Sequence, residues 1–251
     1  MKPDRGRLRV VIVDDEAPAR ALLRDYCSAH GDVEVVAECR NGFEAVKTIG
    51  ETAPDLVLLD VQMPKLDGFE VLELLDRPPI VVFVTAYDEY ALRAFDVHAV
   101  DYVLKPVGRE RFDKALERSR KRRGAPALAP HPAALAAAAR PPGEHLSRVL
   151  VKDGPNVHVI PVGRIDWIEA QDDYVAIHAE GRTHLKNQTL ADLEQGLDPA
   201  RFVRIHRSHL LNVDRLARLE LQAKDSRVAI LKDGKVLPVS RAGYARLREL
   251  M

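Results

Sequence analysis

The N-terminal part of the chain contains two similar stretches, LRVVIVDD at residues 8–15 and LVLLDVQMP at residues 56–64. Each is a short apolar run that ends at one or two aspartates. A continuous apolar run of this length is typical of a strand buried on both faces, as in a parallel sheet covered by helices. The two stretches therefore predict neighbouring strands with Asp14, Asp15 and Asp60 at their carboxyl ends.

The rest of the first 120 residues alternates between strand and helix patterns. Further strands are expected at residues 33–37, 80–84 and 102–104. Helices are expected from Pro18 onward and over residues 43–51, 68–75, 89–95 and 110–120. Five strands alternating with five helices predict a parallel sheet with helices on both faces. We expect an α/β flavodoxin-like (βα)5 domain over residues 1–122, with the strand order 2-1-3-4-5.

The middle of the chain changes composition. Residues 124–143 contain five prolines, many alanines and no acidic residue, which indicates a linker. We place this linker at residues 123–146 and a second domain at residues 147–251. Net charge also divides the chain: residues 1–117 hold 15 Lys and Arg against 23 Asp and Glu, and residues 118–251 hold 23 against 15. An acidic half joined to a basic half fits a regulatory domain tethered to one that meets a polyanion.

The second half is expected to be mainly β. Short runs of alternating polarity recur between residues 149 and 237, and Asp-Gly or Glu-Gly pairs that end at Gly154, Gly181 and Gly234 lie between them. Such pairs favour hairpin turns that need positive φ. Thr189 is expected to cap a brief helix and Ser240 a last helix through residue 250.

The bulk composition bounds the class of protein. The 251 residues are 46% hydrophobic and 30% charged, which suits a soluble protein of two ordinary domains. No apolar run approaches the roughly 18 residues needed to span a bilayer, and the N-terminus does not resemble a signal peptide. Cys27 and Cys39 show no metal-binding or disulfide pattern, so we expect two thiols in a reducing compartment and a cytoplasmic location.

Chemistry-bearing residues gather at the ends of four strands: Asp14 and Asp15, Asp60, Thr85, and Lys105. In the order 2-1-3-4-5 these strands are neighbours about 4.8 Å apart, so their ends converge on one pocket. Three carboxylates and one ammonium leave a surplus of negative charge that Mg²⁺ can balance, and Asp60 can act as a nucleophile on a phosphoryl group.

The other polar groups of this pocket have roles that follow from its charge. Lys105 would stabilise the transferring oxygens and the Thr85 hydroxyl would donate a hydrogen bond to them. Tyr102 lies three residues before Lys105, so its side chain is expected on the opposite face of the strand. It would either report the state of the pocket there or pack against the last helix.

The motifs VDDE (13–16), LDVQMP (59–64), DG (67–68), VTA (84–86) and LKP (104–106) resemble the response-regulator receiver domain over residues 8 to about 122. The resemblance implies that Asp60 accepts phosphate from a sensor histidine kinase or from small phosphodonors. It also implies that Asp15, Asp60 and the backbone carbonyl of Gln62 hold Mg²⁺, with Asp14 assisting through water. Thr85 and Tyr102 match the family's switch pair, and the bond from Lys105 to Pro106 is expected to be cis.

The basic half has no helix-turn-helix, zinc-ligand or phosphate-loop pattern. Its richest stretch is FVRIHRSHLLN at residues 202–212, whose outward groups can donate to phosphates and guanine edges. By its residue types alone this stretch equally fits an amphipathic hairpin with a charged solvent face. The six histidines from His145 to His209 have no spacing that suits zinc.

Five segments resemble the LytTR DNA-binding domain over residues 148–250: WIEA (167–170), YV (174–175), TL (189–190), FVRIHRSHLLN (202–212) and LPVSR (237–241). The resemblance implies loops that enter successive major grooves of double-stranded DNA at paired repeats. It places Arg207 and Arg241 at base-contacting positions. Three further residues are candidates for the same surface: Tyr174, Lys186 and His206. His209 stands where tyrosine is common, and Ala242 where a second basic residue often follows.

These observations predict a two-component response regulator that works without enzymatic turnover. Phosphorylation of Asp60 would favour a homodimer that places two output domains on neighbouring half-sites of DNA. A rival hypothesis is a phosphatase with an Asp nucleophile, but Gln62 stands where such enzymes carry their general acid. Another is a receiver whose β domain contacts proteins instead of DNA.

Overall fold

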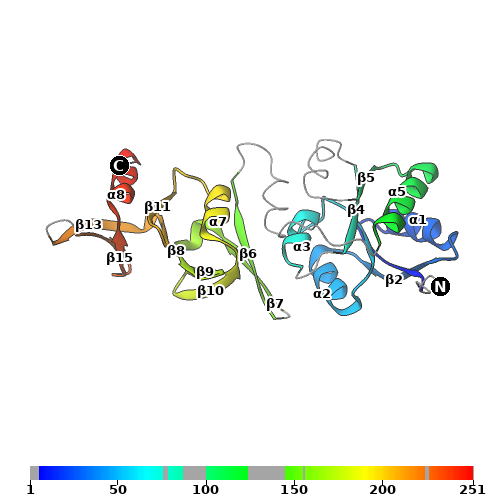
Figure 1. Cartoon of the computed structure of the whole chain (residues 1–251), viewed down its shortest axis with the longest axis horizontal. Helices are drawn as coiled ribbons and strands as arrows, with labels where there is room; N and C mark the ends of the chain where they lie inside the picture. Colours follow the sequence, from blue (N-terminus) through cyan, green and yellow to red (C-terminus); the bar gives the residue numbers. More distant parts are fainter. Residues whose placement is uncertain are drawn as a thin grey trace. The chain divides into compact units, whose positions relative to one another are not determined.

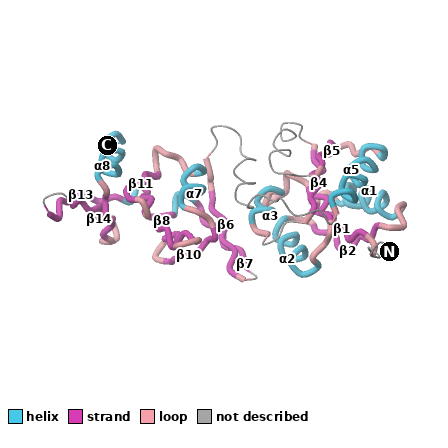
Figure 2. The backbone as a smooth tube through the Cα atoms, viewed as in Figure 1, coloured by secondary structure: helices cyan, strands magenta, loops and turns pink. Residues whose placement is uncertain are grey.

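The structure is a computed structural model that describes residues 6–75, 79–86, 100–123, 145–154, 156–223 and 226–250. The chain divides into two compact units, residues 1–140 and 141–251, which Figures 1 and 2 draw with their helices and strands. The helix expected at residues 89–95 and the proline-rich run at 124–143 lie outside the described residues.

The N-terminal unit contains one parallel sheet in the order β2-β1-β3-β4-β5, as predicted. Its strands are β1 (Leu8–Val13), β2 (Val33–Cys39), β3 (Leu56–Leu59), β4 (Ile80–Thr85) and β5 (Asp101–Leu104). Its described helices are α1 (Ala17–Ser28), α2 (Gly42–Thr52), α3 (Gly68–Glu73) and α5 (Arg109–Arg122). This confirms the flavodoxin-like fold class.

Helices cover both faces of this sheet. Leu23 of α1 and Phe112 of α5 pack with Val10 and Ile12 in one core cluster, so α1 and α5 share a face (Figure 1). Because side chains alternate along a strand, the buried Val11 and its neighbours in register point to the other face. Burial on both faces explains why these strands read as unbroken apolar runs.

Local signals set the helix starts. Proline stands in the first turn of α1, where its missing N–H costs nothing. Asn41 caps α2 by accepting from the Glu44 backbone N–H. Asp67 and Glu70 form a capping box at α3, so α3 begins directly behind the segment that follows Asp60.

The C-terminal unit is mainly β, as expected. Its strands form a β6–β7 ribbon, a five-stranded antiparallel sheet and a three-stranded sheet. The ribbon consists of β6 (Arg148–Asp153) and β7 (Asn156–Pro161). The five-stranded sheet has the order β10-β9-β8-β12-β11, made of β8 (Ile165–Gln171), β9 (Tyr174–Ala179), β10 (Arg182–Asn187), β11 (Phe202–His206) and β12 (His209–Asn212). The third sheet consists of β13 (Leu216–Ala223), β14 (Ser226–Leu231) and β15 (Val236–Val239).

Turns and helix caps in this unit follow the sequence signals. Glu180 and Gly181 both have positive φ between β9 and β10, and Gly154 and Gly234 have positive φ in their turns. Thr189 caps α7 (Leu190–Gly196). Ser240 caps α8 (Arg241–Leu250) by accepting from the backbone N–H of Gly243.

Two cores lie on the two faces of the five-stranded sheet. Ile168 and Leu210 face the cluster that contains Leu193 of α7, whereas Trp167 and Leu211 face the cluster built from the three-stranded sheet and α8. The helix α8 approaches β11 so closely that a Cβ on Gly243 would lie 2.0 Å from the carbonyl oxygen of Ile205. Only glycine allows this approach.

We therefore predict that Gly243→Ala destabilises the protein by about 1–3 kcal/mol, because α8 or β11 must move to make room for the methyl group. The free energy of unfolding is measured by urea titration of the full chain. Gly163→Ala is the matched control, since its added Cβ meets only Arg201 Nη2 at 3.7 Å. Equal stability of the two variants would contradict the close packing of α8.

Candidate functional site

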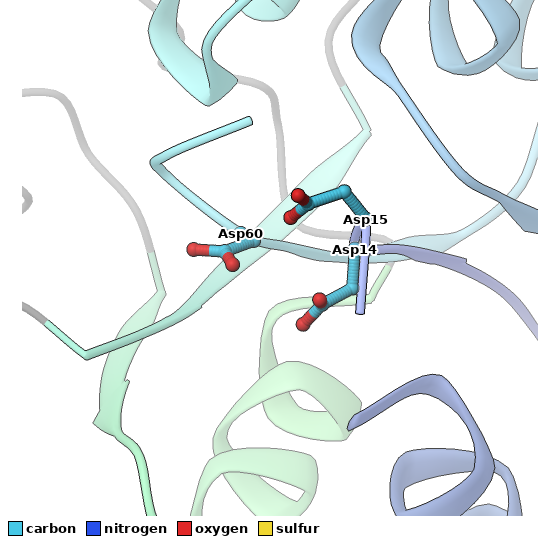
Figure 3. Close-up of side chains that lie close together, drawn as sticks. All are labelled: Asp14, Asp15 and Asp60. Carbon is cyan, nitrogen blue, oxygen red and sulfur yellow. The ribbon is translucent and has the colours of Figure 1, made fainter. Parts of the chain in front are cut away.

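The ends of β1 and β3 bring three carboxylates together (Figure 3). One carboxylate oxygen from each of Asp14, Asp15 and Asp60 lies within 4.8 Å of the other two. Asp14 is fully buried, Asp60 is nearly so, and Asp15 is exposed. The predicted convergence of these side chains is therefore present, with one open side to the cluster.

Lys105, just beyond β5, extends its ammonium into this cluster. Its Nζ lies 2.7 Å from Asp60 Oδ2 and 2.8 Å from Asp14 Oδ2. Burial acts to lower the pKa of Lys105, but the contacts with Asp14 and Asp60 outweigh it and raise that pKa above its usual value. Lys105 therefore carries its charge at every physiological pH and neutralises part of the acidic cluster.

Asp14 shows what burial does to the acidic partner. Desolvation raises its pKa, against the lowering effect of Lys105 and of the backbone N–H of Glu16. Among the described residues, Asp14 Oδ2 accepts no hydrogen bond of good geometry, so its contact with Lys105 is ionic. An oxygen of this kind, beside two further carboxylates, is a ligand that a hard divalent cation prefers. The donor set fits Mg²⁺.

Two residues that the sequence reading left without a role hold this pocket. Glu16 Oε2 lies 3.2 Å from Lys105 Nζ, and the Glu16 backbone N–H donates to Asp14 Oδ1. Arg20 Nη1 donates to the backbone carbonyls of Asp14 and Asp15. In the sequence, Glu16 is visible as an acidic residue next to Asp15, and Arg20 as a basic residue in the following helix. Only the fold shows that their side chains point towards the pocket.

Thr85 and Tyr102 occupy neighbouring strands. The hydroxyl of Thr85 is fully buried at the end of β4 and has no hydrogen-bond partner among the described residues. Tyr102 is also buried, and its ring lies 6.4 Å from that of Phe83. Phe83 packs against Phe69 of α3 with the two rings tilted, on the sheet face opposite α5. Tyr102 is thus buried on the sheet face opposite α5.

The peptide bond from Lys105 to Pro106 is cis, as expected. Gly68 at the start of α3 lies so close to Asp60 that a Cβ would be 2.4 Å from the Asp60 carbonyl oxygen. Its backbone N–H donates to Val61. The segment after Asp60, which includes Gln62, is therefore held by direct backbone packing, and the Gln62 backbone N–H donates to Asp60 Oδ1.

In the C-terminal unit, several candidate residues lie at one end of the five-stranded sheet. The turn His206–Ser208 joins β11 to β12, and its Ser208 carbonyl accepts from the Ala170 backbone N–H near the end of β8. Tyr174, 47% exposed, starts β9 at this same end, paired with Gln171. Arg207 is exposed, and no hydrogen bond or ion pair holds its guanidinium within the described residues.

The start of α8 reaches the same turn. The backbone N–H and the hydroxyl of Ser240 both donate to the carbonyl of Ile205, at 2.8 and 3.0 Å. Arg241 follows Ser240 directly, and Arg207 follows Ile205 by two residues. Two arginines 34 positions apart in the chain thus project from one shared anchor.

Lys186 does not lie on the exposed surface where the sequence analysis expected it. Its side chain is buried, and its Nζ donates to the Leu150 carbonyl at 2.6 Å because the β6–β7 ribbon covers this part of β10. The neighbouring Leu185 is 53% exposed. Lys186 therefore holds the ribbon against the sheet and is not placed to contact DNA.

The two histidines of the turn differ in exposure. His206 is half-buried, and its Nδ1 lies 2.9 Å from Ser208 Oγ. His209 is buried, stacks on Trp167 and lies 3.6 Å from Glu169. Burial lowers the pKa of His209, although Glu169 acts to raise it. His209, the residue that departs from the LytTR pattern, thus supports the turn from the buried side of the sheet.

Comparisons with known proteins agree with both units. Residues 10–117 match the response regulator receiver domain, and residues 155–251 match the LytTr DNA-binding domain. The transcriptional regulatory protein BtsR of Escherichia coli strain K12 is 34% identical over 244 residues, covering 96% of this chain and 98% of that protein. An uncharacterized response regulatory protein of Shewanella oneidensis is 37% identical over 245 residues, covering 96% and 97%. A solved LytTr domain from Bacillus cereus covers 42% of this chain and 96% of its own, at 25% identity and a TM-score of 0.39.

Similarity that spans both domains defines the class of protein: this chain is a two-component response regulator that acts on DNA. It belongs to the family in which a receiver domain is followed by a LytTR DNA-binding domain. Receiver domains take a phosphoryl group from a kinase and bind Mg²⁺ in an acidic pocket, and Asp14, Asp15 and Asp60 form such a pocket here. None of the described helices is long and apolar enough to cross a membrane.

The ion pairs of Lys105 lead to a stability prediction. Without divalent cations, Lys105→Met leaves two buried carboxylates without their counter-ion, so the free energy of unfolding should fall by about 3 kcal/mol. Chemical denaturation in the presence of a chelator measures it. Lys114→Met, on the exposed side of α5, removes the same charge and should change little. Should both variants unfold alike, the Lys105 contacts would not stabilise the pocket.

Proposed function

We propose that Asp60 accepts a phosphoryl group from a sensor histidine kinase and that its phosphorylation controls sequence-specific DNA binding and transcription. The observation that carries the proposal is the setting of Asp60: its carboxylate lies 2.7 Å from Lys105 Nζ and next to Asp14 and Asp15. A carboxylate oxygen of Asp60 forms the new bond to phosphorus as the bond to the donor nitrogen breaks. The ammonium of Lys105 then stabilises the negative oxygens.

The metal in this proposal is Mg²⁺. Asp15, Asp60 and the backbone carbonyl of Gln62 would hold it, with Asp14 acting through water, because these are hard oxygen donors around a surplus of negative charge. Bound Mg²⁺ supplies charge neutralisation for the incoming phosphoryl oxygens. Asp14, which has an ionic but no well-formed hydrogen-bonded contact at Oδ2, is suited to the water-mediated role.

Coupling to DNA begins at Thr85. Its buried hydroxyl has no partner among the described residues and is a donor for a phosphoryl oxygen on Asp60. Movement of Thr85 opens space beside the neighbouring strand, and Tyr102 is the large side chain on that strand that can respond. We propose that this pair shifts the receiver towards a homodimer, which sets two output domains on paired repeats.

In the output domain, Arg207 and Arg241 are the proposed base readers, with His206 and Tyr174 on the same surface. The support is that Arg207, Arg241 and Tyr174 are exposed, and that the turn after β11, the start of β9 and the start of α8 lie at one end of the sheet. The proposed boundaries are a receiver at residues 1–122, a linker at 123–146 and the DNA-binding domain at 147–251. We place the protein in the cytoplasm, where kinase, Mg²⁺ and DNA are all accessible.

We further propose that the pocket transfers and releases one phosphoryl group without enzymatic turnover on phosphate esters. Gln62 stands two residues after Asp60, where phosphatases with an Asp nucleophile carry a general acid, and a neutral amide is too weak an acid to protonate a leaving group. Appreciable steady-state hydrolysis of small phosphate esters would revive the phosphatase hypothesis.

The proposed phosphorylation of Asp60 leads to a prediction. Incubation with a small phosphodonor and Mg²⁺ should add one phosphate to the wild type and none to Asp60→Asn, as measured by intact-protein mass spectrometry. A chelator should prevent the addition, because the acidic pocket then lacks its cation. Asp25→Asn, an exposed residue of α1, is the control and should be phosphorylated normally. Labelling of Asp60→Asn would show that another residue is the acceptor.

The proposed base readers lead to a prediction about DNA binding. Binding to duplexes selected from a random pool should weaken steeply as salt rises. Arg207→Ala and Arg241→Ala should each cost about 1–3 kcal/mol on the selected duplexes and much less on unselected ones. Fluorescence anisotropy titrations measure both. Arg182→Ala, at the opposite end of the sheet, is the control of equal charge. A uniform loss on all duplexes would make the two arginines phosphate contacts.

A further inference from the structure

Arg204 lies on β11, three residues before the proposed base reader Arg207, with its side chain 25% exposed. Its guanidinium has two committed nitrogens. Nη1 donates to Glu194 Oε2 on α7 at 2.9 Å, and Nη2 donates to the backbone carbonyl of Arg207 at 2.6 Å. Arg204 thus connects α7, which packs on the sheet, with the main chain of the His206–Ser208 turn, called the recognition turn below.

The bridge is anchored at both ends. α7 is fixed because Leu190 and Leu193 are buried in the core cluster beside the sheet. The backbone carbonyl of Arg204 accepts from Arg246 Nη1 of α8, and the carbonyl of Ile205 accepts from Ser240. The end of β11 is therefore held from α7 on one side and from α8 on the other.

The far side of the turn is held by a second set of bonds. Ser208 Oγ lies 2.9 Å from His206 Nδ1 and 2.9 Å from His209 Nδ1. These bonds lock the residues on either side of Arg207, but they do not touch its carbonyl. Among the described residues, the direct contact to the main chain of Arg207 comes from Arg204.

We propose that Arg204 is a positioning residue for DNA recognition: it fixes the peptide of Arg207 and thereby aims that exposed guanidinium. The proposal rests on the proposed role of Arg207 as a base reader. A guanidinium suits the task because its rigid fork reaches two acceptors at once, which a lysine ammonium does not reproduce. Its pairing also neutralises Glu194, a carboxylate that would otherwise repel DNA phosphates close to the turn.

The geometry distinguishes this role from direct phosphate contact. A phosphate would have to compete with the Glu194 carboxylate and with a short bond to a carbonyl, both already made within the protein. Arg207, in contrast, can meet DNA without giving up a bond within the described residues. Arg204 therefore acts through Arg207.

A double-mutant cycle on the full chain tests the proposal. The wild type, Arg204→Lys, Arg207→Ala and the double variant are titrated with a duplex selected from a random pool and with its single-base variants. We expect Arg204→Lys to lower the preference for the selected duplex about tenfold. In the Arg207→Ala background the same change should have no further effect on preference, because the residue being aimed is gone. Arg204→Ala, which removes the charge, is titrated over a range of salt concentrations, and its salt dependence should equal that of the wild type because Arg204 does not contact phosphate.

Glu194→Ala is a second variant that leaves the turn sequence intact, and it should lower the same preference by releasing the far end of the bridge. Arg201→Ala is the control: it lies on the same segment and pairs with Asp214, away from the turn, so the preference should persist. Thermal unfolding of each variant shows whether it is folded, and the preference is compared among variants that melt as the wild type does.

The outcomes separate the two proposals. Additive losses of Arg204 and Arg207 would overturn the positioning role of Arg204 alone, and a smaller salt dependence of Arg204→Ala would make Arg204 a phosphate contact. An Arg207→Ala variant that keeps the full base preference would overturn the proposed role of Arg207, and the positioning by Arg204 with it. Coupled losses at unchanged salt dependence support both.

Discussion

The ion pairs of Lys105 with Asp14 and Asp60 are the interactions on which the receiver pocket depends. The three side chains come from the ends of β1, β3 and β5, and they meet because these strands lie close together in the parallel sheet. A fully buried carboxylate such as Asp14 is costly without a cation, and Lys105 supplies one in the absence of metal. The pocket is thus stable while it stays attractive to a divalent cation and a phosphoryl group.

In both units, a glycine lets two backbone segments pack closely, and this packing holds a nearby reactive or recognition residue in place. Gly68 lets the start of α3 lie against the carbonyl of Asp60, and Gly243 lets the start of α8 lie against the carbonyl of Ile205. In each case a helix N-terminus touches main chain directly, so the functional side chain nearby is held by rigid elements. Sites built in this way keep their geometry better than sites on unsupported loops.

The recognition end of the output domain combines a fixed main chain with an exposed guanidinium. Ser240 donates to the carbonyl of Ile205, Arg204 donates to the carbonyl of Arg207, and Ser208 hydrogen-bonds to the side chain of His206. The Arg207 side chain itself is exposed to solvent. Loss of backbone freedom before binding reduces the entropic cost of ordering a reading group on DNA. With Arg207 in its proposed role, this arrangement would let a turn between two strands serve in place of a recognition helix.

The amino-acid sequence by itself determined the two folds and the convergence of the acidic pocket. Unbroken apolar runs and glycine turns are local signals, and the carboxyl ends of neighbouring parallel strands must meet at one edge. Together with the strand order of the flavodoxin-like fold, those signals were enough to predict the caps at Thr189 and Ser240 and the grouping of Asp14, Asp15, Asp60 and Lys105.

Only the tertiary structure decided where individual polar side chains point. Polarity alone would turn Leu185 inward and Lys186 outward, yet Leu185 is exposed and Lys186 is buried under the β6–β7 ribbon. Tyr102 is buried beside Phe83, and Glu16 and Arg204 have partners distant in sequence. The physical reason is that the direction and burial of a side chain depend on which element packs over it, and that packing joins segments whose relation no local pattern encodes.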